Sequence, residues 1–322
     1  MSPEFRTHEV ELPAAAAGQR LDQALAAALP QYSRARIQRW IRDGRVELAG
    51  GGTARASARV HGGERLRLHA QFEPDAALEP EERPLAIVHE DAALIVLDKP
   101  PGLVVHPGAG NRRGTLQQAL LAHDPDLARV PRAGLVHRLD KDTSGLLIVA
   151  RTPEAHTRLV AALAARTIRR EYLALVVGRP TGGGTIDEPI GRHRQQRTRM
   201  SVRADGRTAV THYRIEERFR AHTLLRVRLE TGRTHQIRVH LAHAGFPVVG
   251  DPLYGGRRRL SAGAAPALAA ALQSFRRQAL HAARLAFAHP VDGRPLEFSA
   301  PLPADFEALL AELRADARGA AA

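Results

Sequence analysis

The sequence predicts an α+β protein in which a large domain with a mixed, largely antiparallel sheet follows a small N-terminal α/β module. From Leu85 onward, short apolar runs alternate with turns and show no regular strand–helix–strand pattern. The stretch from Gln71 to Pro84 is acidic and contains three prolines, which is typical of a linker. We therefore divide the chain into a module (residues 17–75), a linker (76–84), a main domain (85–303) and a C-terminal helix and tail (304–322).

The module begins with two expected helices. The first carries its apolar positions Leu21, Ala24, Leu25 and Leu29 on one face and ends at Pro30. The second runs from Arg34 to Arg42, with Ser33 as its N-cap and Gly44 beyond its end. Its buried stripe is Ile37, Trp40 and Ile41, and its other faces carry Arg34, Arg36, Arg39 and Arg42. Residues 46–48 and 65–68 are expected to form short strands.

The main domain shows its strands as apolar runs, clearest at residues 87–88, 93–97, 145–150 and 172–177. A helical pattern extends from Pro153 to Ala165, and another extends from Ala304 to Arg314. The small-residue tail after Arg314 is expected to fray.

Composition limits the classes of function. The chain has 322 residues, of which 44% are apolar and 25% charged, as in an ordinary globular protein. No apolar run approaches the length of a membrane span, and the N-terminal residues lack the layout of a secretion signal. Because cysteine is absent, disulfides, thiolate zinc sites and cysteine nucleophiles are excluded. These features favour a cytoplasmic protein.

The net charge of +13 favours a polyanionic partner. Only two of the 47 basic residues are lysines, Lys99 and Lys141, which indicates a GC-rich coding bias. Such a bias exchanges lysine for arginine and leaves the charge unchanged, so nucleic acid remains the leading partner class.

Residues 134–147 contain the strongest chemical pattern. A run of ionisable side chains, including Asp140, directly precedes a hydrophobic strand, so that these groups lie on a loop held by a sheet. A structural alternative is a turn in which residues 142–145 cap the strand. Physical reasoning alone leaves both interpretations open.

The segment His137-Arg138-Leu139-Asp140-Lys141-Asp142-Thr143-Ser144-Gly145-Leu146-Leu147 resembles a motif of the RluA-like RNA pseudouridine synthases, the kind that modify large-subunit ribosomal RNA. His137 at its first position resembles the large-subunit branch of these enzymes. Further blocks in matching order are residues 90–102, 170–174, 231–240, 250–255 and 278–282. The module resembles the S4 RNA-binding domain at residues 20–22 and 33–38, and departs from it at residues 50–52.

The resemblance implies how the uridine-to-pseudouridine reaction is divided among residues. Asp140 is the essential carboxylate, which adds to the sugar or the base or removes a proton. It must be ionised, and a neighbouring arginine favours that form. Arg238 matches the position of this ion-pair partner, and Arg233 ranks second. Tyr172 lies against the base, where it stacks or removes the C5 proton.

The same resemblance implies how RNA is held. Leu280 packs at the base, and Arg138 enters the space left when the base leaves its helix. His137 and Arg233 are further RNA-binding candidates in the main domain, while Arg34, Arg36 and Arg39 are those of the module. We expect a monomer that acts on structured RNA, with the large ribosomal subunit as the leading source, and without cofactor or metal.

Competing interpretations are weaker. Asp140 and Asp142 are too close in the chain for a flanking glycosidase pair, so Asp142 is expected to be a turn residue. No Gly-Lys-Ser/Thr follows the glycines at 108–114, which disfavours a P-loop. His235, His240 and His243 lack the companions of a zinc site. A non-catalytic RNA-binding or ribosome-assembly protein that keeps the fold remains the alternative.

Overall fold

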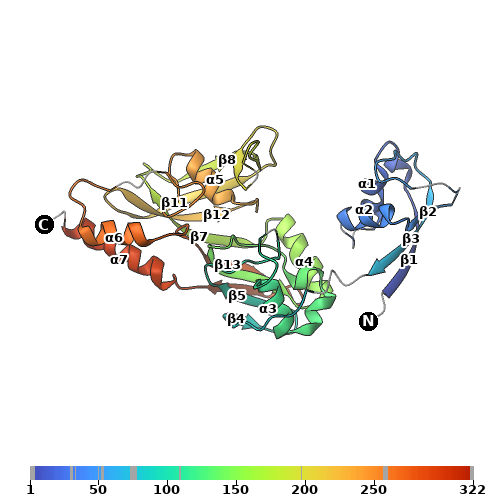
Figure 1. Ribbon diagram of the computed structural model, residues 1–322, viewed down its shortest axis with the longest axis horizontal. Helices are drawn as coiled ribbons and strands as arrows, with labels where there is room; N and C mark the ends of the chain where they lie inside the picture. Colours follow the sequence, from blue (N-terminus) through green and yellow to red (C-terminus); the bar gives the residue numbers. More distant parts are fainter. Residues whose placement is uncertain are drawn as a thin grey trace. The chain divides into compact units, whose positions relative to one another are not determined.

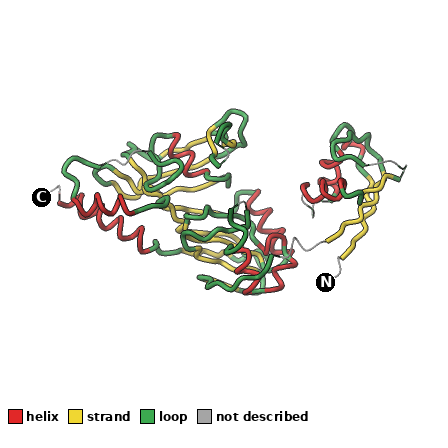
Figure 2. Tube along the Cα trace, viewed as in Figure 1, coloured by secondary structure: helices red, strands yellow, loops and turns green. Residues whose placement is uncertain are grey.

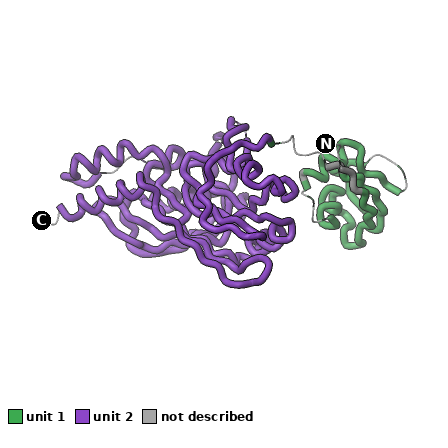
Figure 3. The backbone as a smooth tube through the Cα atoms, turned by 90° about the horizontal axis from the view of Figure 1, so that it is seen from below, with its two compact units in different colours: residues 1–78 green, residues 79–322 purple. Residues whose placement is uncertain are grey.

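The computed structural model describes residues 4–29, 32, 34–49, 51, 54–72, 78–108, 110–196, 198–256 and 260–319. The chain divides into two compact units, residues 1–78 and 79–322, coloured separately in Figure 3. The division falls within the expected linker. Glu79 and Glu81 already belong to the second unit, because the side chain of Gln118 donates to the Glu79 carbonyl and the Gly114 amide donates to the Glu81 carboxylate.

Unit 1 is a three-stranded antiparallel sheet with two helices. The sheet has the order β1-β3-β2, formed by Glu4–Glu11, Arg65–Phe72 and Val46–Leu48. The helices are α1 (Leu21–Ala28) and α2 (Arg34–Arg42). As predicted, the apolar stripes of both helices are buried in one core.

The boundaries of unit 1 differ from the prediction. The module was expected to begin at residue 17, yet β1 supplies an edge strand before that point. The strand expected at 65–68 extends to Phe72. The predicted helix end at Pro30, the cap at Ser33 and two of the three glycines at 50–52 lie outside the described residues.

Unit 2 is built on one mixed sheet, which has nine strands among the described residues (Figure 1). Its order is β4-β5-β6-β13-β7-β12-β11-β8, with β14 paired to β13. Of these pairs only β6 and β13 are parallel, so the expected largely antiparallel sheet is confirmed for the part of the chain that the structure describes. The strands are β4 (Ile87–Glu90), β5 (Leu94–Lys99), β6 (Ser144–Ala150), β7 (Arg169–Val177), β8 (Gly184–Asp187), β11 (Val210–Arg218), β12 (His222–Leu229), β13 (Leu280–Ala288) and β14 (Pro295–Ser299).

Both faces of the sheet are buried around β5 and β6. On β5, Ile95 and Leu97 join one core, whereas Leu94 and Val96 join another on the opposite face. Side chains on both faces of these strands are therefore apolar, which explains why the strands appear in the sequence as unbroken hydrophobic runs. A separate hairpin pairs β9 (Ile190–Arg192) with β10 (Met200–Val202).

Helices cover this sheet (Figure 2). They are α3 (Leu116–His123), α4 (Pro153–Ala164), α5 (Gln236–His243), α6 (Pro266–Ser274) and α7 (Ala304–Gly319). Unit 2 also has the short 3-10 turns η2 (Pro125–Arg129) and η3 (Pro131–Gly134), and unit 1 has its own, η1 (Ala14–Ala16). None of the helices in the described residues is long and apolar enough to cross a membrane.

The C-terminal helix is part of unit 2. Helix α7 packs against α6 and buries Phe306, Leu309, Leu310 and Leu313 in the main core. The prediction that the chain frays after Arg314 is wrong as far as Gly319, because the helix continues to that residue. Arg314 itself pairs with Glu217 of β11, and Asp316 accepts hydrogen bonds from Arg220 and from the Ala265 amide.

Candidate active site

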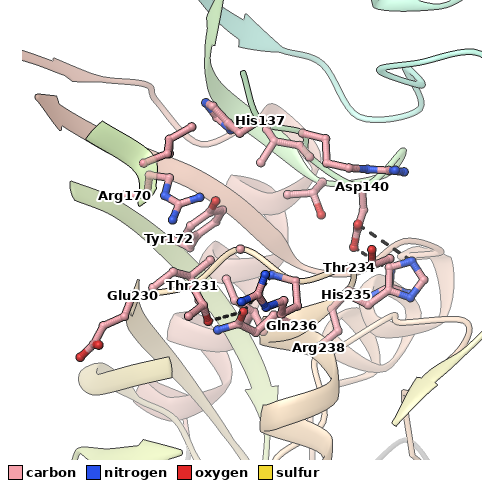
Figure 4. A pocket seen from close by; sticks show the side chains of 18 of the residues that line it. His137, Asp140, Arg170, Tyr172, Glu230, Thr231, Thr234, His235, Gln236 and Arg238 are labelled. Atoms are coloured by element: carbon pink, nitrogen blue, oxygen red, sulfur yellow. Dashed lines mark hydrogen bonds and ion pairs between the residues drawn. The ribbon is translucent and has the colours of Figure 1, made fainter. Parts of the chain in front are cut away.

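A pocket of about 510 Å³ in unit 2 is lined by four segments (Figure 4). They are the loop around Asp140 (residues 136–140 and 143), the end of α4 with the turn after it (Leu163, Ala164 and Arg166), the face of β7 that carries Arg170 and Tyr172, and the loop at 229–238 that leads from β12 into α5. Leu280, at the start of β13, also lines the pocket. The sequence blocks at 134–147, 170–174, 231–240 and 278–282 thus meet in one cavity.

The loop that carries Asp140 is held by buried polar contacts. Lys99, whose side chain is only 1% exposed, donates from Nζ to the carbonyls of Pro100 (2.8 Å), Leu103 (3.1 Å) and Lys141 (2.9 Å). These three acceptors match the three hydrogens of an ammonium group. Burial lowers the pKa of Lys99 to about 7, against the opposing influence of Asp142 and Asp140. The residue after Asp140 is therefore tied directly to the end of β5.

A glycine permits the strand after this loop to reach its partner. A Cβ atom at Gly145 would lie 2.3 Å from the Ala282 carbonyl oxygen, in the parallel pairing of β6 with β13. Gly145 also has a φ of +108°, outside the range that other residues prefer. The glycine in the motif therefore serves the sheet rather than the pocket.

Asp140 is one of two carboxylates that share the guanidinium of Arg238. The Asp140 Oδ2 atom accepts from Arg238 Nη1 at 2.9 Å. On its other edge Arg238 donates from Nε (2.7 Å) and Nη2 (2.8 Å) to Asp251. Asp251 further accepts from the amides of Leu253 and Tyr254. The two-point pair with Asp251 fixes the plane of the guanidinium, so that its remaining nitrogen points at Asp140.

The charges in this cluster stabilise each other. Burial opposes the charged form of Arg238, but the hydrogen bonds and charges of Asp251 and Asp140 outweigh it and raise the arginine's pKa. Burial likewise acts to raise the pKa of Asp251, and the contact with Arg238 reverses this and lowers it. Arg233, the rival partner, donates instead to the Thr208 carbonyl.

His235 lies beside the carboxylate. Its Nε2 atom is 3.9 Å from Asp140 Oδ1, and its Nδ1 atom is 2.8 Å from the Tyr254 hydroxyl. Tyr254 also accepts from the Met200 amide, which connects the β9–β10 hairpin to the site. His235 adopts the left-handed conformation, with φ at +57°. Burial lowers the pKa of His235, so the ring is neutral near pH 7.

Gln236 holds the loop that precedes α5. Its side-chain oxygen accepts from the Thr231 hydroxyl (2.8 Å) and the Arg233 amide (3.0 Å). Its nitrogen donates to the Val210 carbonyl and the Thr211 hydroxyl. The ring nitrogens of His240 contact the Thr211 hydroxyl and the Glu188 carbonyl.

Tyr172 and Leu280 form an apolar wall opposite the carboxylate. Tyr172 is 5% exposed and Leu280 is 3% exposed, and both line the pocket on adjacent strands. Burial raises the pKa of Tyr172, so the side chain is a neutral phenol near pH 7. A flat ligand that reaches this wall therefore meets an aromatic ring with a hydroxyl.

The remaining candidates have separate positions. Arg138 is exposed at the pocket, and His137 lines its wall with Nε2 accepting from the Ile148 amide at 3.1 Å. Burial lowers the pKa of His137 to about 3. Arg34, Arg36 and Arg39 all lie on α2 of unit 1, where Arg34 contacts the buried Asp22. Asp142 lies outside the pocket and its carbonyl accepts from Arg277.

Comparison with known proteins shows which family the chain belongs to. The chain is 55% identical to the ribosomal large subunit pseudouridine synthase D of Xanthomonas campestris pv. campestris, over 96% of this chain and 93% of that protein. The chain belongs to the RNA pseudouridine synthase family. Residues 93–243 match the family model described as RNA pseudouridylate synthase, and residues 19–66 match the S4 domain. The protein is thus an isomerase that acts on RNA, which favours the enzyme over the non-catalytic alternative.

Other relatives agree with this assignment. The protein of the same description from Pseudomonas aeruginosa is 54% identical over 95% of each chain. Among solved structures, human RNA Pseudouridylate Synthase Domain Containing 4 is similar at a TM-score of 0.57 and 26% identity, over 71% of this pseudouridine synthase and 93% of that chain. Human RNA Pseudouridylate Synthase Domain Containing 1 gives a TM-score of 0.53 at 27% identity, over 70% and 86%.

Several residues of the site received no role from the sequence. Lys99, Arg170 and Asp251 all lie within the blocks that carry the family resemblance, but none was singled out. For Arg170 a signal existed, because residues two apart on a strand share a face and Tyr172 was already assigned to the pocket. The contacts of Lys99 and Asp251 depend on tertiary structure and had no such signal.

Proposed function

We propose that the protein isomerises uridines in structured RNA of the large ribosomal subunit, with Asp140 as the essential carboxylate. The observation that carries the assignment is the ion pair between Asp140 and Arg238 beside an apolar wall. The printed descriptions of its curated relatives name the large ribosomal subunit, which supports the choice of substrate. A monomeric, cytoplasmic protein that needs no cofactor fits this function.

The geometry suggests a division of labour. A uracil ring placed against Tyr172 and Leu280 brings the attached sugar toward Asp140. The carboxylate then assists cleavage of the N1–C1′ bond, by addition or by proton removal. Arg238 holds the carboxylate in place, and the phenol of Tyr172 is available for the C5 proton. Arg138, exposed at the pocket, is free to fill the gap that the flipped base leaves in the RNA helix.

Two aspartates two residues apart provide the test. Asp140→Asn keeps the size of the side chain but removes its charge and its nucleophile. We expect normal folding, RNA binding close to that of the wild type, and no tritium release from large-subunit RNA labelled at C5 of uridine. Asp142→Asn is the matched control and should remain active, because Asp142 lies outside the pocket. Turnover by the Asp140 variant, or a dead Asp142 variant, would disprove the assignment.

A further inference from the structure

Arg170 is a buried cation that has no partner in the described chain. Its side chain is 8% exposed, lies on the pocket side of β7, and makes no hydrogen bond or ion pair with any described residue. The Nε atom is fully buried and unsatisfied, and the side chain lines the pocket. Burying a charge without a partner costs on the order of several kcal/mol. We therefore expect this arginine to bind a ligand that supplies the missing partner.

The carboxylates near Arg170 are already engaged. Glu230 lines the pocket but pairs with Arg166 and His212, and Asp140 pairs with Arg238. Glu171 points to the opposite face of β7, where it meets Arg226. Among the described residues, no carboxylate neutralises Arg170, so we expect its partner to come from the substrate.

The position of Arg170 in the pocket determines which part of the RNA can contact it. Arg170 lies beside Tyr172, on the same face of β7, and Figure 4 shows the two side chains together across the cavity from Asp140. A Cβ atom at residue 232 would come within 3.1 Å of Arg170 Nη1, so Gly232 leaves room for the guanidinium. With uracil against Tyr172 as proposed above, we expect the RNA phosphates to stay near Arg138 and Arg166, which are exposed. The group that enters as deep as Arg170 is the base.

We propose that Arg170 binds the uracil ring and stabilises the negative charge that the ring acquires when the N1–C1′ bond breaks. The inference rests on the proposed function. As this bond breaks, its electron pair stays with uracil and spreads over N1, O2 and O4, whether Asp140 adds to C1′ or removes a sugar proton. When C5 then bonds to C1′, the C5 proton leaves and N1 is protonated, which restores a neutral base.

The neighbours of Arg170 suit this role. His137 is a neutral ring, because Nε2 accepts from the Ile148 amide and the proton is therefore on Nδ1. That Nδ1 donor is buried and unsatisfied, so the wall beside Arg170 offers a second donor to a ligand. Positively charged donors aimed at developing charge in a water-poor pocket are among the largest single contributions to catalysis.

The test compares Arg170→Gln with Arg169→Gln in the full-length protein. Arg169 is the adjacent residue on β7, is exposed, and lies on the other face of the strand, so the control removes the same charge. With enzyme in excess over a large-subunit RNA fragment, Arg170→Gln should slow single-turnover tritium release by about 10²–10³-fold. Its Kd for RNA should stay within about twofold of the wild type, and Arg169→Gln should change neither quantity by more than about twofold.

Two outcomes would overturn the proposal. A raised Kd together with a salt slope reduced by about 0.7–0.9 would identify a phosphate contact instead. An unchanged rate would show that Arg170 does not act on the base. Because the wild type is assayed on the same RNA, a wrong choice of substrate would appear as an inactive wild type. If only the role of Arg170 is wrong, the wild type will be active and Arg170→Gln will release tritium as fast as the wild type and Arg169→Gln do.

A second measurement separates leaving-group stabilisation from a folding defect. Fluorine at C5 of the target uridine makes the departing base a weaker base that needs less stabilisation. The loss caused by Arg170→Gln, measured as disappearance of the target nucleoside, should therefore be smaller on the fluorinated RNA than on the natural one. A variant that is merely misfolded would lose the same factor on both substrates, and that result would refute the proposal.

Discussion

At the scale of single residues, the site depends on one guanidinium held between two carboxylates. Arg238 has five N–H donors in a planar fork. Two of its nitrogens donate to Asp251, and the third donates to Asp140. A lysine at this position has no plane to fix and could not be aimed in this way. Asp251 therefore controls the position of Asp140 without contacting it.

Tyr172 allows the stacking and proton-transfer roles to be separated. Tyr172→Phe keeps the ring and removes the hydroxyl. We expect tritium release to fall by about 10²–10⁴-fold, the usual worth of a general base, while a rearranged intermediate accumulates. RNA binding should remain near that of the wild type. If the Phe variant stays within a few-fold of the wild type and only Tyr172→Ala is slow, stacking is the sole role of this side chain.

The residues of the site were predictable to the extent that their roles are local. The loop with Asp140 was found because ionisable residues directly precede a hydrophobic strand. The choice of Arg238 over Arg233 came from the family resemblance, and the structure shows that Arg238 makes the contact. Asp251 and Lys99 were not found, because each acts through partners that the chain brings close only after folding.

At the scale of elements, helices α1 and α2 are joined by a buried carboxylate. Asp22 is fully buried in α1, and it accepts hydrogen bonds from Arg20, Arg34 and Gln38. Burial acts to raise the pKa of Asp22, but the hydrogen bonds from these partners outweigh it and hold the pKa well below its usual value. A carboxyl of this kind stabilises the fold above its unfolded pKa of about 3.9, and this stability is lost as pH falls toward the folded pKa.

Asp22→Asn should therefore destabilise unit 1 by about 3 kcal/mol at pH 7, since it leaves two arginines without their anion. The difference from the wild type should shrink progressively below about pH 4. Trp40 is the only tryptophan of the chain and is buried in unit 1, so urea unfolding followed by its fluorescence reports on this unit. Asp43→Asn, at an exposed position just after α2, is the control. A pH-independent difference would contradict the assigned role.

Elements were predictable where burial sets a clear period. The strands β5 and β6 were expected because both of their faces are buried. Strand β1 was missed because its residues are mostly polar, and it is held by pairing with β3. That pairing places Arg67 next to Glu9 and Arg65 next to Glu11. Such cross-strand contacts are invisible in an eight-residue window.

At the scale of the whole molecule, the two units have separate cores, and the pocket residues all belong to unit 2. Deleting residues 1–78 should therefore leave a folded protein that still modifies RNA, but binds it more weakly. For every phosphate that unit 1 binds, the deletion should reduce the slope of log K against log salt by about 0.9 for duplex RNA or 0.7 for single strands. Binding measured from low to high salt checks this, and an unchanged slope would mean that unit 1 does not contact phosphates.

The burial of Lys99 has a practical consequence for labelling. The chain contains two lysine side chains, and Lys99 is enclosed while Lys141 is exposed one residue after Asp140. Of these two amines, only Lys141 is open to an acylating dye. A fluorophore attached there would sit at the edge of the pocket and change its emission when RNA arrives. Because the chain has no cysteine, a single introduced thiol could carry the second dye of an energy-transfer pair.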